Sequence, residues 1–271
     1  MSKNIQIAIA GANGKMGTLL SELIKSKDDF EISDTTQKIQ GSEINGDYLF
    51  IFVPANKINL IIKRGAAGLI KEDWGNIKKG VIVGSSGMDS TSLQALKDYT
   101  KSENKLACVI PNFSIGAMYQ KLVSRKIQKD FENIEIVEKH HSSKIDCPSG
   151  TSIDLASSLE KKDSINDSDR TYLDDLMDGY RPIPSLTESK LSGIQTDKKT
   201  MINNIPIDSI RSDEFMAEQI VMFKNQYEEF NTEHIVTDRK AYLTGLNLVL
   251  DKLESLNGYY HGLEKILNKR A

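Results

Sequence analysis

The chain has 271 residues, 39% of them hydrophobic and 27% charged, with a net charge of −3 and an isoelectric point near 5.9. This length suits one large domain or two moderate ones, whose core needs no disulfide bonds. The mildly acidic balance argues against a general nucleic-acid-binding protein, although local cations and helix N-termini can still bind a small anion. The sequence has two cysteines, no signal-peptide pattern at its start and no apolar run of transmembrane length. These features predict a cytoplasmic protein that does not enter the membrane.

Apolar runs alternate with amphipathic stretches through the N-terminal half. Buried strands are expected at residues 4–11, 30–33, 47–53, 80–84 and 106–110. The first strand leads into a helix whose apolar residues share one face because they recur every three or four positions. These residues are Met16, Leu19, Leu20, Leu23 and Ile24. The alternation predicts an α/β fold, a Rossmann-type doubly wound parallel sheet, for a dinucleotide-binding domain over residues 1–112.

A second domain with its own sheet is expected over residues 113–239. It would contain a helix at 114–127 and further strands at 133–141, 205–212, 218–225 and 228–237. The polar region 160–204 reads as exposed loops or short helices. We expect a C-terminal amphipathic helix over residues 240–271 to return to the first domain, with one apolar face formed by Leu246, Val249, Leu250 and Leu253.

A glycine-rich loop separates the first strand from the first helix. Gly11, Gly14 and Gly17 have G-x-x-G-x-x-G spacing. Such glycines permit a tight turn and a close approach of backbone N–H groups to a pyrophosphate at the helix N-terminus. The alternative is a strand-to-helix turn without a ligand. The flanking strand and amphipathic helix favour a dinucleotide.

The choice between NADH and NADPH depends on the segment after the second strand. An acidic residue about 20 residues beyond the loop typically binds the ribose. We expect the second strand to end at Asp34, whose carboxylate would accept from the ribose hydroxyls and favour NADH. Thr35, Thr36 and Lys38 could instead contact a 2′-phosphate and favour NADPH, or the segment is a plain polar turn. The sequence leaves both cofactors open.

The stretch KHHSSKIDCPSGTS, residues 139–152, holds two of the four histidines of the chain. His140 and Lys144 follow an expected strand and can supply protons at neutral pH. Helix N–H groups from Gly150 onward would be available to a carboxylate, with Lys144 adding a charge-assisted bond. Thr151 with Asp154 resembles a capping box, and Ser149 is an alternative cap. Taken singly, each residue could be merely structural. Together they predict a site that binds and protonates a carboxylate substrate.

Two alternative chemistries were considered for this stretch. Cys147 could be a thioester-forming nucleophile, as in semialdehyde dehydrogenases. It directly precedes Pro148 without a recognisable nucleophile context, so a small apolar filler is the favoured reading. No zinc-type ligand spacing is present in the sequence, and we expect no metal.

Residues 140–151, HHSSKIDCPSGT, resemble the H-H-x-x-K-x-D-[small]-P-S-G-T signature of the 4-hydroxy-tetrahydrodipicolinate reductase (dihydrodipicolinate reductase) family of the diaminopimelate–lysine pathway. The segments AGANGKMG (10–17), VGSSGM (83–88) and PNFSIG (111–116) agree with this family in order and spacing. The resemblance implies a second α+β domain with a mixed sheet, which binds substrate and joins four subunits into a homotetramer. It also implies hydride transfer from NADH or NADPH to a cyclic dicarboxylate, with loss of water.

The resemblance implies a role for each matching residue. His140 would be the general acid/base and Lys144 the partnering proton donor. The substrate would contact His141, Ser149, Gly150 and Thr151. Cofactor contacts would come from the pyrophosphate loop, Asp34, the nicotinamide side and its closing segment: Gly11, Ala12, Asn13, Gly14, Lys15, Met16, Asp34, Gly84, Ser85, Ser86, Ile110, Pro111, Asn112 and Phe113.

Some positions depart from the family pattern. Val53 stands where a threonine is common, and RSDEFMAEQ (211–219) keeps Arg211 but has Gln219 in place of a histidine. His234 and Arg239 fit the following H-x-x-x-x-R segment. The alternative function is therefore a nicotinamide-binding sensor or a catalytically impaired relative, although a pure sensor has no need of a proton donor beside a carboxylate site.

Overall fold

The computed structural model describes residues 4–36, 44–64, 74, 76–86, 88–159 and 198–267. The chain forms two compact units: residues 1–119 with 238–271, and residues 120–237. The expected boundary after residue 112 therefore differs from the observed one, which lies within α4 (Ile115–Ile127). Two segments read as loops, at residues 161–170 and 187–197, lie outside the described residues, as does Lys38.

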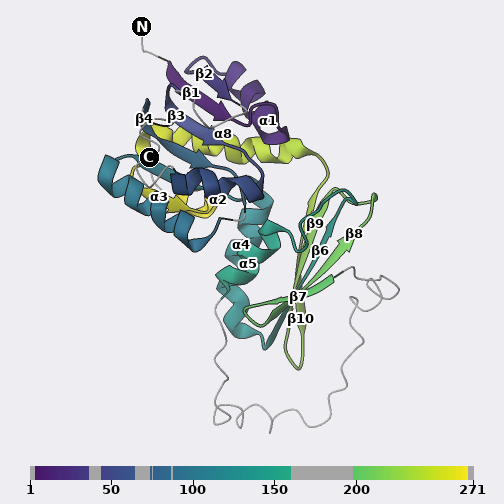
Figure 1. Cartoon of the computed structure of the whole chain (residues 1–271). Coiled ribbons are helices and arrows are strands. Elements are labelled where there is room, and N and C mark those ends of the chain that lie inside the picture. The colour runs from purple at the N-terminus through teal and green to yellow at the C-terminus, as the bar shows by residue number, and fades with distance from the viewer. Residues whose placement is uncertain are drawn as a thin grey trace. The chain divides into compact units, whose positions relative to one another are not determined.

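Unit 1 contains a six-stranded parallel sheet in the order β11-β5-β4-β3-β1-β2. The strands are β1 (Ile5–Ala10), β2 (Phe30–Thr36), β3 (Gly46–Ile51), β4 (Ile77–Val83), β5 (Leu106–Val109) and β11 (Tyr259–His261). The helices of unit 1 include α1 (Lys15–Lys25), α2 (Ala55–Arg64), α3 (Ser90–Glu103), α8 (Leu243–Lys252) and α9 (Leu263–Leu267). Figure 1 shows α2 and α3 together, apart from α1 and α8. This arrangement confirms the predicted doubly wound sheet.

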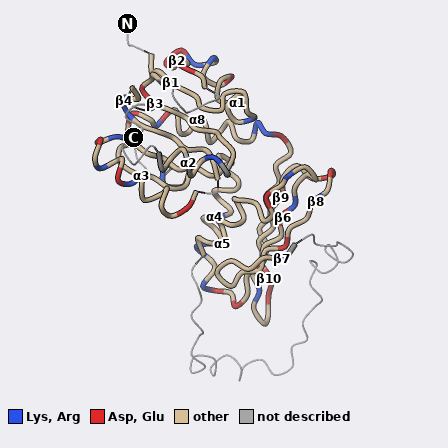
Figure 2. Tube along the Cα trace, viewed as in Figure 1, with Lys and Arg blue, Asp and Glu red and all other residues tan. Residues whose placement is uncertain are grey.

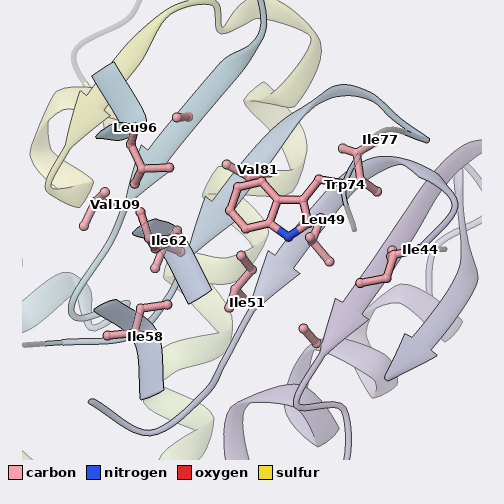
Figure 3. Close-up of a cluster of buried hydrophobic side chains, with 14 residues drawn as sticks. Ile44, Leu49, Ile51, Ile58, Ile62, Trp74, Ile77, Val81, Leu96 and Val109 are labelled. Atoms are coloured by element: carbon pink, nitrogen blue, oxygen red, sulfur yellow. The ribbon is translucent and has the colours of Figure 1, made fainter. Parts of the chain in front are cut away.

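The sheet core explains why the central strands read as continuous apolar runs. Parallel strands covered on both faces have no solvent-facing side, and Ile7 to Ala10 are accordingly fully buried. Figure 3 shows the Trp74 indole lying with Leu49 and Val81 among the aliphatic side chains contributed by several strands and helices. Burying each such side chain contributes about 1.5–3 kcal/mol.

Strand order sets the position of a ligand site in unit 1. From β1 the chain passes through α1 to β2 on one side, whereas β3 pairs with the other side of β1. The end of β1 is thus a topological switch point, where open α/β sheets bind ligands beyond the carboxyl ends of their strands. The glycine loop follows β1 at this point.

Unit 2 contains a mixed five-stranded sheet in the order β10-β9-β6-β8-β7, in which β6 and β8 are parallel and the other pairs antiparallel. The strands are β6 (Asn133–His140), β7 (Lys198–Ile202), β8 (Ile205–Arg211), β9 (Ala217–Lys224) and β10 (Glu229–Val236). Leu155 and Ala156 of α5 (Gly150–Ser158) pack with sheet residues such as Val221 and Phe223. Figure 2 shows both signs of charge interspersed along the described parts of the two units.

Three expectations about secondary structure were wrong. Strand β2 continues to Thr36 instead of ending at Asp34, and its pairing with β1 is irregular at Ile7/Ala8. Residues 198–202 form β7 instead of a loop. The segment 240–271 is not one helix, because α8 ends at Lys252 and Gly258, at φ +78°, turns the chain into β11.

Candidate active site

The glycine loop has the geometry expected for close backbone packing. Gly11 has φ +85°, and a Cβ there would lie 2.1 Å from the Phe52 carbonyl oxygen. A Cβ on Gly17 would lie 2.3 Å from the Gly11 carbonyl oxygen, so this glycine lets α1 approach the loop. The Gly14 N–H donates to the Gly11 carbonyl at 2.9 Å, which closes the turn. Both outer glycines are therefore required by the fold.

The N-terminus of α1 is suited to a pyrophosphate. Its N-cap residue is Gly14, with φ −78° and ψ 166°, and no side chain caps the helix. The first backbone N–H groups of a helix have no acceptor within it, and its dipole favours an anion there. Asn13, Gly14 and Lys15 are exposed. Ala12 is buried and Met16 half-buried, so they support the loop from the protein side. These residues fit a dinucleotide phosphate.

Asp34 lies two residues before the end of β2, opposite Ala8 of β1. Its Oδ2 accepts from the Asn45 backbone N–H at 3.4 Å. Thr36 is the residue at the strand end, and its carbonyl accepts from the Gly11 N–H at 2.8 Å. Thr36 is therefore closer in sheet register to the glycine loop than Asp34 is.

The other predicted cofactor residues of unit 1 follow β4, which pairs with β3, and β5, which pairs with β4 in the same parallel sheet. Gly84 follows β4 and packs against two rings, since a Cβ there would lie 2.2 Å from Phe52 and 3.0 Å from Phe113. Phe52 and Phe113 themselves meet edge to face, 5.9 Å between centroids. Carboxyl ends of parallel strands share one edge, so these loops line the same edge as the glycine loop.

Hydroxyl and amide groups in these loops already make internal contacts. Ser85 Oγ donates to the Val53 carbonyl at 2.7 Å and accepts from the Val53 N–H at 3.1 Å. Its hydroxyl proton is thus committed to joining the segments that follow β3 and β4. Ser86 is half-buried. Asn112 Oδ1 accepts from the Ser114 N–H at 2.8 Å, which shapes the turn before α4.

In this turn Ile110 is fully buried and Pro111 is half-buried. The Ile110 N–H donates to the Val83 carbonyl at 2.8 Å. The turn is therefore fixed directly to the end of β4.

In unit 2, His140 ends β6 with its side chain 15% exposed. Its Nδ1 lies 2.9 Å from Oε2 of Glu138, which has no exposed surface. Residues two apart in a strand point to the same face, so Glu138 and His140 share one side of the sheet. On the neighbouring strand β8, Arg211 pairs with His140 in register and donates from Nη2 to Glu138 Oε1 at 2.8 Å.

The buried carboxylate of Glu138 is ionised. Burial by itself would raise its pKa, but the close charged contact with His140 and the hydrogen bond from Arg211, with a smaller contribution from Ser209, outweigh burial and lower the pKa to about 2. A carboxylate at Nδ1 keeps the proton on that nitrogen and leaves Nε2 as the exchanging atom of His140. This is the arrangement of a histidine oriented for proton transfer.

The loop after β6 brings Lys144 beside a carboxylate. Lys144 Nζ donates to both Asp146 oxygens, at 2.7 and 2.8 Å, and Arg211 Nη2 donates to the Asp146 carbonyl at 2.7 Å. Burial would raise the pKa of Asp146, but the Lys144 ammonium, followed by the N–H groups of Asp146 and Gly150, lowers it. His141 Nδ1 lies 2.7 Å from Ser143 Oγ. An ammonium has three donors, so Lys144 keeps one N–H beyond its two bonds to Asp146.

The α5 turn, residues 149–152, is capped by Ser149. Its Oγ accepts from the Ser152 N–H at 3.2 Å. The capping box expected from Thr151 and Asp154 is wrong, because Thr151 is inside the helix and Asp154 pairs with Lys121 at 2.7 Å. The Ser152 N–H is therefore unavailable to a substrate, contrary to expectation, and the Gly150 N–H already bonds to Asp146.

The structure thus gathers the predicted residues into two sets, one in each unit. It also adds residues that sequence reasoning did not assign: Glu138, Asp146 and Ser209. Glu138 could have been found from its two-residue spacing to His140, which places both on one strand face. Among the described residues, no group of three or more His, Cys, Asp or Glu could hold a metal ion. Within the same residues no helix is long and apolar enough to span a bilayer.

Comparison with known proteins gives the family. Residues 5–72 match the family model for the N-terminus of dihydrodipicolinate reductase, and residues 116–267 match that for its C-terminus. The chain belongs to the dihydrodipicolinate reductase family. This membership confirms the resemblance, and it makes the chain an NAD(P)H-dependent oxidoreductase.

Relatives of this family match nearly the whole of this chain and of their own length. The 4-hydroxy-tetrahydrodipicolinate reductase of Legionella pneumophila is 28% identical over 268 residues, covering 97% of this chain and 99% of the relative. That of a Picosynechococcus species is 27% identical over 285 residues, with 97% and 98% covered. A dipicolinate-bound dihydrodipicolinate reductase from a Paenisporosarcina species has a TM-score of 0.66 at 18% identity, covering 97% of this chain and all of the other. That last likeness is one of fold.

Proposed function

We propose that the chain reduces 4-hydroxy-tetrahydrodipicolinate to tetrahydrodipicolinate in diaminopimelate and lysine biosynthesis. Substrate, NAD(P)H and one proton are converted to product, NAD(P)⁺ and water. The single observation that carries the proposal is His140 held by the buried Glu138 carboxylate, two residues along the strand, within the reductase signature. The relatives that bear this enzyme name match nearly the full chain.

The reduced nicotinamide supplies a hydride when it is bound. The α1 N-terminus would hold its pyrophosphate, because Gly14 leaves the first N–H groups without a side-chain cap. The loops after β4 and β5 would flank the nicotinamide at the same edge of the sheet. Thr36, at the end of β2, would face the adenosine ribose in place of Asp34, so NADH and NADPH are equally supported.

His140 would act as the general acid through Nε2, because Glu138 holds Nδ1. Its proton would complete the addition that the hydride begins, and water would leave from the substrate carbon that carries the hydroxyl. Lys144 would bind a substrate carboxylate through the donor that Asp146 leaves over and would assist the proton transfer. His141 and the N–H groups of the α5 turn would contact the same dianion.

A homotetramer is part of this proposal. Unit 2 exposes apolar side chains on its edge strands, including Phe230 and Ile235 of β10 and Met201 of β7, which are 44%, 51% and 58% exposed. Exposed apolar groups on strands that end a sheet favour association with another subunit. Light scattering of the purified protein should give four times the chain mass of 30.3 kDa.

The experiment that tests the function generates the substrate in the cuvette. Dihydrodipicolinate synthase, pyruvate and aspartate semialdehyde are mixed with the protein, and NADH or NADPH oxidation is followed in parallel reactions. Oxidation should depend on the synthase and reveal which cofactor is preferred. Protein that binds the cofactor but oxidises neither form would contradict the reductase and favour a nicotinamide-binding sensor.

A further inference from the structure

A chain of buried polar side chains connects the sheet of unit 2 to the α5 turn. It runs from Gln120 of α4 through Gln219 of β9 to Ser152 and Ser149. These residues are 5%, 6%, 0% and 3% exposed, respectively. Buried amides and hydroxyls persist where each donor and acceptor finds a partner. The partners here fix a direction along the whole chain.

Two backbone carbonyls set that direction. Gln120 Nε2 donates to the carbonyl oxygens of Gln219, at 2.9 Å, and Thr232, at 3.1 Å. Carbonyl oxygens only accept, so the Gln120 amide cannot be turned over. Its Oε1 must then accept, and it does so from Gln219 Nε2 at 2.9 Å. The Gln219 amide is thereby fixed as well, with its Oε1 directed toward α5.

The direction continues into the helix cap. Ser152 Oγ donates to Gln219 Oε1 at 2.6 Å, which uses the one hydroxyl proton of Ser152. The Ser149–Ser152 contact of 2.9 Å between hydroxyl oxygens must therefore take its proton from Ser149. Ser149 Oγ is left as an acceptor for the Ser152 N–H. The hydroxyl of Ser149 thus has no proton to give to a substrate carboxylate.

We propose that Gln219 is a positioning residue that holds the α5 turn in its anion-binding form. This inference rests on the proposed function. Gln219 fixes the hydroxyl of Ser152 and, through it, that of Ser149, so that the first turn of α5 keeps one geometry where the proposed function places a dianion. Ser149 acts as the cap of this turn, in place of the direct substrate contact that was expected of it.

The position requires one acceptor and one donor on the same side chain. A neutral histidine provides both on its two ring nitrogens, so Gln219→His should preserve the direction of the chain. Leucine provides neither group. Glutamate provides acceptors alone. Gln219→Glu would therefore place a carboxylate oxygen against the side-chain Oε1 of Gln120, which also accepts.

The test measures binding of pyridine-2,6-dicarboxylate, the dipicolinate dianion, to the full-length protein by calorimetry with reduced cofactor present. For Gln219→Leu we expect the Kd to rise about tenfold, the effect of weakening one charge-assisted hydrogen bond. Gln219→Glu should weaken binding in the same direction, and Gln219→His should restore the wild-type Kd. In the coupled assay KM for the substrate should rise, whereas the Kd of the cofactor should stay unchanged.

Gln128→Leu is the matched control, because Gln128 is a buried glutamine of the same unit, 6% exposed, that donates to the Arg125 carbonyl. It should lower the melting temperature and leave the dipicolinate Kd unchanged. Ser152→Ala interrupts the same chain in a helix that tolerates alanine, and it replaces Gln219→Leu if that variant does not fold. Wild-type affinity in the folded Gln219→Leu and Ser152→Ala variants would overturn the inference. A wild-type protein that does not bind dipicolinate would overturn the proposed function with it.

Discussion

The N-termini of α1 and α5 are both expected to face anions, but the protein treats them differently. At α1 the N-cap is Gly14, and no side chain satisfies the first N–H groups. At α5 the N-cap is Ser149, which accepts from the Ser152 N–H, and a buried polar chain holds that serine in place. The first terminus leaves its N–H groups to a ligand, whereas the second shares them with the protein.

This difference suits two kinds of ligand. A dinucleotide pyrophosphate can replace the missing cap with its own oxygens, so backbone N–H groups are enough to bind it at the α1 loop. A small dicarboxylate offers fewer contacts and must be aligned with a proton donor. The α5 turn is accordingly held rigid beside the side chains of His140 and Lys144. Variants of Glu138, which contacts His140, and of Gly11, Ser149 and Gly14 at the two termini test this contrast, with expected effects on stability that decrease in that order.

The largest effect on stability is expected for Glu138, the carboxylate that contacts the proposed proton donor His140. Glu138→Gln removes a fully buried carboxylate and leaves the guanidinium of Arg211 without its charged partner. Loss of one partner of a buried pair costs roughly 3–5 kcal/mol of unfolding free energy. Urea denaturation measures this change. As control, Glu254→Gln removes an exposed ion pair with Lys79 and should cost less than about 1 kcal/mol. Equal costs for the two variants would contradict a buried, ionised Glu138.

Acid should remove the same stabilisation. The pKa of Glu138 is about 2 in the folded protein and 4.5 in its unfolded reference state, so the ionised group stabilises the fold above pH 4.5. That contribution is lost as the pH falls from 4.5 toward 2 and corresponds to roughly 3 kcal/mol. Unfolding free energies measured across this window should fall more steeply for the wild type than for Glu138→Gln. Parallel curves would show that Glu138 does not titrate as described.

Gly11→Ala should damage the uncapped terminus. The left-handed backbone at φ +85° costs a non-glycine residue roughly 1–2 kcal/mol, and the new Cβ would also collide with the Phe52 carbonyl. Cofactor binding, followed by nicotinamide fluorescence, should weaken together with stability. Gly258→Ala separates the two causes, because Gly258 has φ +78° and nothing within 4 Å of its Cβ position. If the two variants lose the same stability, the collision at Gly11 is unimportant.

Ser149→Ala removes the cap of the other terminus. Loss of a serine N-cap typically costs about 1 kcal/mol of unfolding free energy. Asp89→Ala is a matched variant, since Asp89 caps α3 through the Ser92 N–H at 2.7 Å. Thermal denaturation should show similar losses, and calorimetry should show weaker dipicolinate binding for Ser149→Ala alone. Weaker binding in both variants would mean that stability, not the α5 turn, controls affinity.

Gly14→Asp has the smallest expected effect on stability. It gives α1 a side-chain cap like the one that α5 already has. Gly14 has an extended backbone that any residue adopts, but a Cβ there would lie 3.2 Å from the Gly11 carbonyl oxygen. The cap that an aspartate adds to α1 therefore changes the unfolding free energy by only a few tenths of a kcal/mol. The same carboxylate would occupy the position of the pyrophosphate and repel it. The melting temperature should change little while the cofactor Kd increases. Unchanged cofactor affinity would place the pyrophosphate elsewhere.

The sequence predicted the parts of the fold that rest on local patterns. The strand at 5–10, the glycine loop and the helix at 15–25 are contiguous, and each is specified by its own residues. β7 and β11 were missed because they are short edge strands, KKTMI and YYH, whose conformation depends on pairing with β8 and β5.

The predicted site was incomplete for a similar reason. The role of Glu138 depends on Arg211, 73 residues away, and that of Gln219 depends on Gln120, 99 residues away. The spacing to His140 places Glu138 on the same strand face, but its pairing with Arg211 follows only from the sheet. Ser149 differs, because the sequence correctly allowed it as the N-cap of α5. The acceptor of its hydroxyl proton, Ser152 Oγ, follows only from the contacts of Gln219.

The most direct test of the account compares turnover and cofactor binding in His140→Ala. Loss of a general acid should lower kcat in the synthase-coupled assay by about 10²–10⁴-fold, because proton transfer by a positioned side chain typically contributes that much. The Kd of the cofactor, held at the α1 terminus, should stay at the wild-type value. Turnover that persists, or an equal loss of turnover and cofactor binding, would contradict a proton donor at His140 and leave it a structural role.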